Sequence, residues 1–261
     1  PASQRAAAFI LTAAMLTTLA APAFAKTWHI EDGDITVKAG ETKGTNKVSQ
    51  GANQEVEDTD TIITNREAKA SSHTVTIETN DKNDKVEVTL KDVNIDTSSR
   101  NKAAVSVTGE GDTNIKLNGD NALKSDIYRS GIYGSGGVTI SGNTVNAAGG
   151  NGGKVGGYGI CSFDRVAISG GTVTANGGDS KDGYGGDGIH SNDIDLSGSL
   201  ELTAKAGSPN GKALSRAGSE LELDTIKDKL DPGAKVTATD ANGETKQVSI
   251  PRPVEPEKPV I

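Results

Sequence analysis

The sequence predicts an all-β protein that folds as a parallel β-helix, a single-stranded solenoid of about eight coils with three short strands per coil and a period of about 27 residues. One reason is composition: 33% of the residues are hydrophobic, 3% are aromatic and 33 are glycine, which suits short strands and turns better than a large globular core. The other is a repeat, since "VTISGNTVNAAGG", "VAISGGTVTANGG" and "IDLSGSLELTAKAG" begin 28 residues apart at Val138, Val166 and Ile194. A unit this small buries its apolar face only by stacking on the next unit.

The repeat continues as three series of apolar residues, each expected to mark a short strand of alternating apolar and polar residues. The first series is Ile35, Ile62, Val88, Ile115, Val138, Val166, Ile194 and Leu221. The second is Ile77, Val105, Ile132, Ile160, Ile189 and Leu214, and the third is Ile95, Leu123, Val145, Val173 and Leu202. A β-sandwich would instead have strands about 8 to 12 residues apart without a fixed long period, and a β-propeller would have blades of about 40 to 50 residues.

The two ends of the chain differ from the repeats. Residues 1–25 read as a secretory signal peptide, with Arg5, the apolar run "AAAFILTAAMLTTLA" and the small-residue cleavage site "APAFA". Residues 26–248 would form the β-helix domain, and residues 249–261, with "PRPVEPEKPVI", a Pro-rich linker or tail. The remainder has no apolar run of about 18 residues, so we expect a secreted or cell-surface protein without a membrane span.

Charge and cysteine content exclude some partners and some chemistry. The formal net charge is −8, and no basic stripe offers phosphate neutralisation, which disfavours nucleic acid as a partner. Cys161 is the single cysteine, so no intramolecular disulfide is possible. We expect Cys161 to be a small buried residue of a strand and not a nucleophile.

The repeats resemble those of a known family. The runs "VTLKDVNIDTS", "AAVSVTGEGDTNIKLNGDNAL", "GIYGSGGVTISGNTV" and "VAISGGTVTANGG" are similar to those of bacterial carbohydrate-binding domain-containing proteins, over roughly residues 28–245. The resemblance implies a right-handed parallel β-helix related in fold to pectate lyases. It also implies a secreted or surface-bound protein, and for some members binding of acidic plant polysaccharide and calcium.

One corner of the predicted solenoid is enlarged in two neighbouring coils. The segments from Val145 to Ile160 and from Val173 to Ile189 are longer than the corresponding segments of the other coils. Insertions that fall on one side of a solenoid often form its binding surface. All four tyrosines fall in this corner or one residue beyond it, and their rings could stack on sugar C–H groups: Tyr128, Tyr133, Tyr158 and Tyr184. Single exposed tyrosines that need no explanation are the alternative.

The larger of these segments contains "NGGDSKDGYGGDG", from Asn176 to Gly188. Asp179, Asp182 and Asp187 could supply part of the six to eight oxygen ligands that Ca²⁺ takes. A solvated turn rich in Asp and Gly is the competing interpretation, because the stretch departs from the calcium-binding nonapeptide repeat. "GYGGDG" also matches G-x-G-x-x-G, but a strand and not a helix is expected after it, so a dinucleotide site is excluded.

His190 follows Ile189 as Tyr133 follows Ile132 and Cys161 follows Ile160, so it is expected to face outward on the same strip and to join the tyrosines as a carbohydrate contact. Three functions follow from these features. The first is non-catalytic binding of a polysaccharide or cell-surface glycan, assisted by Ca²⁺. The second is a polysaccharide lyase, with candidate bases Arg129, Lys154, Arg165 and Lys181 that are scattered among different corners. The third is a structural or adhesive rod. We favour the first.

Overall fold

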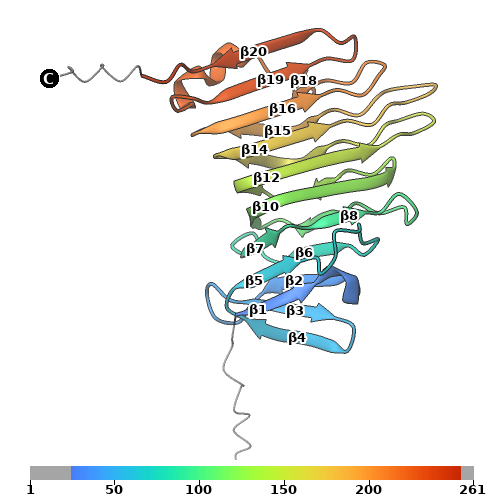
Figure 1. Ribbon diagram of the computed structural model, residues 1–261, viewed down its shortest axis with the longest axis vertical. Helices are drawn as coiled ribbons and strands as arrows, with labels where there is room; N and C mark the ends of the chain where they lie inside the picture. The colour runs from blue at the N-terminus through green and yellow to red at the C-terminus, as the bar shows by residue number, and fades with distance from the viewer. Residues whose placement is uncertain (1–24, 254–261) are drawn as a thin grey trace, which may run out of the picture.

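The structure is a computed structural model that describes residues 25–253; residues 1–24, with nearly all of the predicted signal peptide, and 254–261 of the predicted tail lie outside the described residues. It is an all-β solenoid of about six turns with a repeat of about 28 residues (Figure 1). The described part of the chain contains no helix long and apolar enough to cross a membrane.

Parallel pairing between successive turns falls into three series of strands. The first contains β1 (Lys26–His29), β5 (Thr61–Thr64), β7 (Lys85–Lys91), the first parts of β10 (Asp112–Ile127) and β12 (Val138–Gly150), and the second parts of β13 (Ile160–Ile168) and β15 (Ile189–Leu196). The second contains β2 (Ile35–Ala39), β6 (Val75–Thr79), β9 (Val105–Gly109), β11 (Ile132–Gly134), the first parts of β13 and β15, and β17 (Leu214–Arg216). The third contains β8 (Asn94–Asp96), the second parts of β10 and β12, β14 (Gly171–Asn176), β16 (Leu200–Lys205) and β19 (Lys235–Thr239). In the central turns β10, β12, β13 and β15 each continue from one series into another, so two of the expected short strands are joined there.

The predicted register is confirmed in the centre of the solenoid. Ile132 pairs with Val105 on one side and with Ile160 on the other, and the column continues through Ile189 to Leu214. All five side chains are fully buried. Their neighbours along each strand face outward, as the period of two in a β-strand requires.

Between β10 and β12 the predicted register is wrong by two residues. Ile115 pairs with Ile140 and not with Val138, and Leu123 pairs with Ala147. A shift of two keeps every side chain on its own face, so the interior stays apolar despite the error. Strand β10 has one extra residue relative to β12 at each of two irregularities, between Leu117 and Asp120 and between Lys124 and Ile127.

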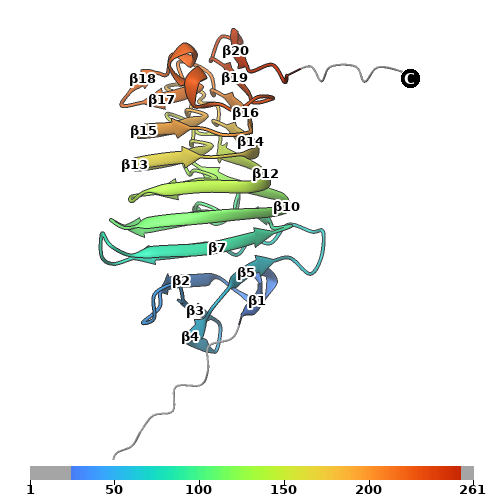
Figure 2. The same cartoon turned by 90° about the vertical axis from the view of Figure 1, so that its left-hand side faces the viewer.

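The ends of the solenoid also depart from the predicted register. The predicted first series places Ile35 beside Ile62 and Ile62 beside Val88. In the structure Ile35 pairs with Val75, and Ile62 pairs with Thr89. At the N-terminal end the antiparallel strands β3 (Asn46–Gln50) and β4 (Asn53–Asp58) extend from β2 (Figure 2). At the C-terminal end are β18 (Ser219–Glu220), the 3₁₀ helix η2 (Leu223–Lys229) and β20 (Thr245–Ser249); a second 3₁₀ helix, η1 (Ile30–Asp32), follows β1. These elements cover end turns that have no further turn to stack on.

Trp28, the single tryptophan, secures the N-terminal end. Its side chain is 1% exposed, and its Nε1–H donates a 2.7 Å hydrogen bond to Oδ2 of Asp58, which is also buried. The backbone N–H of Lys26 donates to the other carboxylate oxygen of Asp58 over 3.0 Å. A buried carboxylate costs free energy unless it is hydrogen-bonded, and both of its oxygens are satisfied here.

Candidate functional site

Three loops stack on one another where the chain passes from the third series of strands to the second. We call residues 151–159, 177–188 and 206–213 the corner loops; they stand one above the other at the right of Figure 1. Isolated parallel bridges join Gly152 to Ser180 and Val155 to Tyr184. The enlarged corner predicted from the sequence is therefore an ordered stack of backbone and not a loose fringe.

Glycine is required in these loops because backbone approaches backbone. A chain of peptide hydrogen bonds, each 2.8 Å long, runs along the stack. In each bond the N–H of the first residue donates to the carbonyl oxygen of the second: Gly157 to Gly150, Gly178 to Gly157, Gly186 to Gly178, and Gly207 to Gly186. A Cβ atom at Gly157, Gly178 or Gly186 would lie 1.9, 2.2 or 1.9 Å from a backbone oxygen, which no real side chain tolerates. The glycines thus allow tight stacking, and the loops hold the corner rigid beside the second series.

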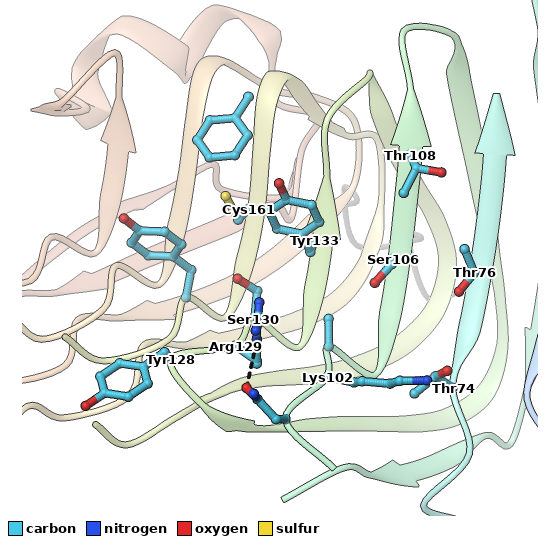
Figure 3. Close-up of a pocket in the computed structure, with 14 residues that line it drawn as sticks. Thr74, Thr76, Lys102, Ser106, Thr108, Tyr128, Arg129, Ser130, Tyr133 and Cys161 are labelled. Carbon is cyan, nitrogen blue, oxygen red and sulfur yellow. Dashed lines mark hydrogen bonds between the residues drawn. The ribbon is translucent and has the colours of Figure 1, made fainter. Parts of the chain in front are cut away.

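A groove of about 500 Å³ lies on the outer surface of the second series, next to this corner (Figure 3). Its base crosses β6, β9, β11 and β13 through Thr76, Ser106, Tyr133 and Cys161, which are partners in successive strands. With strands about 4.8 Å apart, the base is about 14 Å long. The groove therefore runs along the solenoid axis across four turns.

The end of the groove toward the C-terminus is aromatic. Tyr133 packs edge-to-face on Phe163, with ring centroids 5.9 Å apart and an interplanar angle of 79°. Tyr128 and Tyr158 line the same groove from the corner side. The Tyr128 hydroxyl accepts a 3.1 Å hydrogen bond from the Gly153 N–H of the first corner loop. Three of the four predicted tyrosines are therefore brought together.

The other end is polar, and the charged residues of the groove are cationic. Thr76, Ser106 and Thr108 present hydroxyl groups, and Lys102 and Arg129 are the charged residues that line the groove. Arg129 Nε donates a 2.9 Å hydrogen bond to Oδ1 of Asn101 and, within residues 25–253, forms no ion pair. Its remaining guanidinium donors are consequently available to a ligand.

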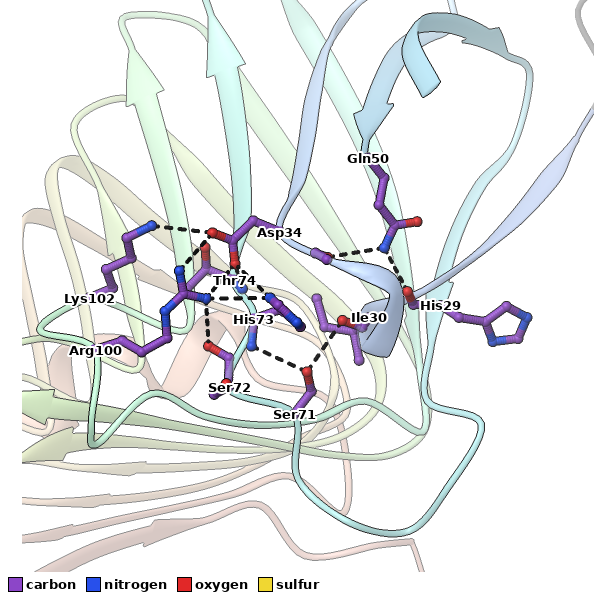
Figure 4. A network of polar contacts seen from close by, with 11 residues as sticks. His29, Ile30, Asp34, Gln50, Ser71, Ser72, His73, Thr74, Arg100 and Lys102 are labelled. Atoms are coloured by element: carbon purple, nitrogen blue, oxygen red, sulfur yellow. Dashed lines mark hydrogen bonds and ion pairs between the residues drawn. The ribbon is translucent and has the colours of Figure 1, made fainter. Parts of the chain in front are cut away.

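Asp34 contacts Thr74 and Lys102, which line the polar end of the groove, and joins them to Arg100 (Figure 4). Its carboxylate accepts hydrogen bonds of 2.7 and 3.0 Å from Arg100 and 2.9 Å from the Thr74 N–H, and Lys102 Nζ lies 3.3 Å away. Partial burial alone would raise the pKa of Asp34, but the hydrogen bonds from Arg100 and Thr74, with Lys102 nearby, outweigh it and hold that pKa well below its usual range. His73 Nδ1 also lies 3.3 Å from Asp34 Oδ1. Three segments of the first turns are thereby joined through one carboxylate: that of Asp34, residues 73–74 and residues 100–102.

His190 stands behind the aromatic end. Its ring stacks on Tyr158 with centroids 4.6 Å apart and planes 12° from parallel. Its Nδ1 lies 2.7 Å from Oδ2 of Asp187, and because a carboxylate only accepts, Nδ1 carries the proton. The prediction that His190 shares a strip with Tyr133 and Cys161 is confirmed, since the three are partners in successive strands.

Cys161 is fully buried beneath this group. Burial, together with the negative charge of Asp187, raises the pKa of the Cys161 thiol to about 12. A thiol is a nucleophile only as the thiolate, so this group is inert at neutral pH. Burial and the charge of Asp187 likewise raise the pKa of the Tyr158 hydroxyl.

The three aspartates proposed for calcium occupy different environments. Asp187 is 7% exposed, and its Oδ1 accepts a 2.7 Å hydrogen bond from the Lys212 N–H in addition to the contact with His190. Asp179 and Asp182 are exposed, and Asp179 accepts a 2.8 Å hydrogen bond from the Ser208 N–H. Over residues 25–253 no three His, Cys, Asp or Glu side chains form a group that could hold a metal ion. The three do not fit a single ligand set.

Other predicted residues lie apart from the groove. Tyr184 is 66% exposed at the outer part of the second corner loop, beside Val155 of the first. Of the candidate bases, Arg129 lines the groove, Arg165 lines a separate hollow of about 300 Å³ on the first series, and Lys154 and Lys181 are on the corner loops.

Phe163, Lys102 and the row of hydroxyls were not predicted. Phe163 lies two residues after Cys161 and therefore on the same outward face of β13, which is the signal that could have identified it.

The chain was also compared with known proteins. No protein-family model, no curated protein and no solved structure matched it. The resemblance to bacterial carbohydrate-binding proteins therefore stays a prediction.

Proposed function

We propose that the protein is a non-catalytic carbohydrate-binding module that holds a polysaccharide in the groove of the second series. The observation that carries this proposal is the meeting of Tyr128, Tyr133 and Tyr158 with Phe163 in one open groove. Aromatic rings offer flat apolar faces to the C–H groups of a sugar, and tyrosine keeps a hydroxyl for hydrogen bonding. The hydroxyls of Thr76 and Ser106 continue the same surface along the axis.

The charge of the groove favours an acidic polysaccharide. Its charged lining residues, Lys102 and Arg129, are both cationic, whereas the whole chain carries a formal net charge of −8. A guanidinium can bind a carboxylate through two parallel hydrogen bonds. Lys102 is partly neutralised by Asp34, so Arg129 is the residue we assign to a sugar carboxylate.

The proposal extends to the location of the protein and to the form of the solenoid. We propose a bacterial protein that acts outside the cell or at its surface, as the predicted signal peptide suggests, and a right-handed solenoid with three faces per turn. Tyr184 is proposed to contact sugar units that leave the groove, because its exposed ring lies beside the exposed side chain of Val155. His190 belongs to the proposed site through the stacking of its ring on Tyr158.

Calcium assistance is a separable part of the proposal. It depends on the exposed carboxylates of Asp179 and Asp182, because both oxygens of Asp187 have protein partners. Thermal melts with Ca²⁺ and with EDTA, in the wild type and in an Asp179→Asn/Asp182→Asn variant, test it. No shift in either protein would remove the metal from the account.

A polysaccharide lyase is the alternative, because Arg129 lies in the groove beside a second cation. β-Elimination from a uronate needs a base at the C5 proton and positive charge at the carboxylate. The chain from Lys26 to Ile261 should be applied to a glycan array and incubated with polygalacturonate in an ultraviolet assay for 4,5-unsaturated uronate. We expect binding without product. Product formation would establish the lyase, and no binding to any glycan would favour a structural rod.

A further inference from the structure

Tyr158 lines the groove, and its ring stacks on a side chain distant in the sequence. Its two neighbours in the chain, Gly157 and Gly159, have no side chain that could fix its ring. The partner that does contact the ring is His190, which stacks on it at 4.6 Å. One face of the ring therefore rests on the imidazole, and the ring lines the groove.

His190 in turn has a fixed position. Asp187 is buried and accepts from His190 Nδ1 through one oxygen and from the Lys212 N–H through the other, each over 2.7 Å. Because Lys212 belongs to the third corner loop, the carboxylate joins the second corner loop to the third. An imidazole hydrogen-bonded to such an anchored carboxylate keeps one orientation.

Neither His190 nor Asp187 lines the groove. We propose that Asp187 and His190 are positioning residues that hold the Tyr158 ring in the orientation in which it receives a sugar face. This inference rests on the proposed function and assigns His190 an indirect role in it. The imidazole acts through Tyr158, and the groove's affinity depends on a pair of side chains outside the groove.

A double-mutant cycle tests this with polygalacturonate as the probe, measured by isothermal titration calorimetry. His190→Gln keeps a hydrogen-bond donor toward Asp187 but removes the ring. We expect it to weaken binding about two- to tenfold, the range of an aromatic pair. In a Tyr158→Ala background the same substitution should cause no further loss, because the two act as one unit. In a Tyr133→Ala background its effect should persist in full.

His190→Phe is the rescue variant, since it keeps a ring against Tyr158 while losing the bond to Asp187. We expect near wild-type affinity for this variant even where its melting temperature falls. Additive losses from His190→Gln and Tyr158→Ala would show that His190 contacts the glycan itself and would overturn the proposal. Failure of His190→Phe to restore binding would also contradict it.

A measurement without ligand separates this inference from the proposed function. In ¹³C-tyrosine-labelled protein, the Tyr158 ring signals should move toward exposed-tyrosine values in His190→Gln and stay near the wild type in His190→Phe. Unchanged signals in His190→Gln would overturn the positioning role whatever the glycan result. If the wild type fails to bind while these signals change as expected, the ring is held by His190 but the proposed function fails, and the positioning role in binding fails with it.

Discussion

Gly178→Ala should destabilise the stack of corner loops strongly. The new Cβ would lie 2.2 Å from the carbonyl oxygen of Gly150, whereas ordinary contact begins at 3.4 Å, so the two backbones must separate by about 1.2 Å. Gly178 also donates to Gly157 O and accepts from Gly186 N–H, each at 2.8 Å. Gly157 belongs to the same turn as Gly150, so a separation of this size stretches the bond to Gly157 beyond hydrogen-bonding distance, whereas the bond from Gly186 lies within the loop of Gly178 itself.

The expected cost follows from these contacts. Overpacking costs about 1–3 kcal/mol, and the lost hydrogen bond about 1 kcal/mol, which together give about 2–4 kcal/mol. For a domain of this size 1 kcal/mol corresponds to about 2–4 °C, so the melting temperature should fall by about 4–16 °C. Thermal unfolding followed by circular dichroism measures the shift directly.

Gly153→Ala is the matched control in the neighbouring loop. Its Cβ would meet a single atom within 4 Å, the Tyr128 hydroxyl at 3.2 Å, which is the end of a side chain and is able to move. We expect a shift within about 2 °C for this variant. Equal melting temperatures for the two variants would refute the argument that the glycines serve close backbone packing.

Two further predictions concern single side chains. Asp34→Asn should lower the melting temperature at pH 7 by about 2–4 °C. Because the folded-state pKa of Asp34 is depressed, its stabilisation is present above the unfolded-state pKa of about 4 and is lost as the pH falls toward the folded-state value, so the difference between variant and wild type should shrink in acid. A pH-independent difference would contradict this. Cys161, with a pKa of about 12, should resist iodoacetamide at pH 8 in the native protein and react on unfolding, as mass spectrometry can show; rapid native labelling would disprove its burial.

The second series in the centre of the solenoid could be predicted from the sequence, because successive turns there repeat the same environment, whereas the predicted register of β10 on β12 is wrong by two residues. Ile132 and Ile160 occupy equivalent positions, so their spacing in the chain gives their pairing in space. The ends lack this equivalence. Ile35 pairs with Val75 although an antiparallel hairpin is inserted between them in the chain. This pairing depends on contacts between residues distant in sequence and not on any period.

The candidate site was predictable in part for the same reason. The four tyrosines fall at one corner of the repeat, so their spacing in the sequence predicts a binding surface there. The pairing of Asp187 with His190 and the seating of Tyr158 on that imidazole depend on side-chain orientation, which spacing does not specify. The three aspartates also illustrate this, since Asp187 is buried while Asp179 and Asp182 are exposed although all share one loop.

The central claim is that the groove of the second series binds glycan. Its most direct test uses the glycan that an array selects and compares the affinities of three proteins for it. These are the wild type, a Tyr133→Ala/Phe163→Ala variant, and a control variant on the first series, Thr139→Ala. We expect the groove variant to lose at least about tenfold in affinity and the control to match the wild type. Equal affinity in all three proteins would contradict the account.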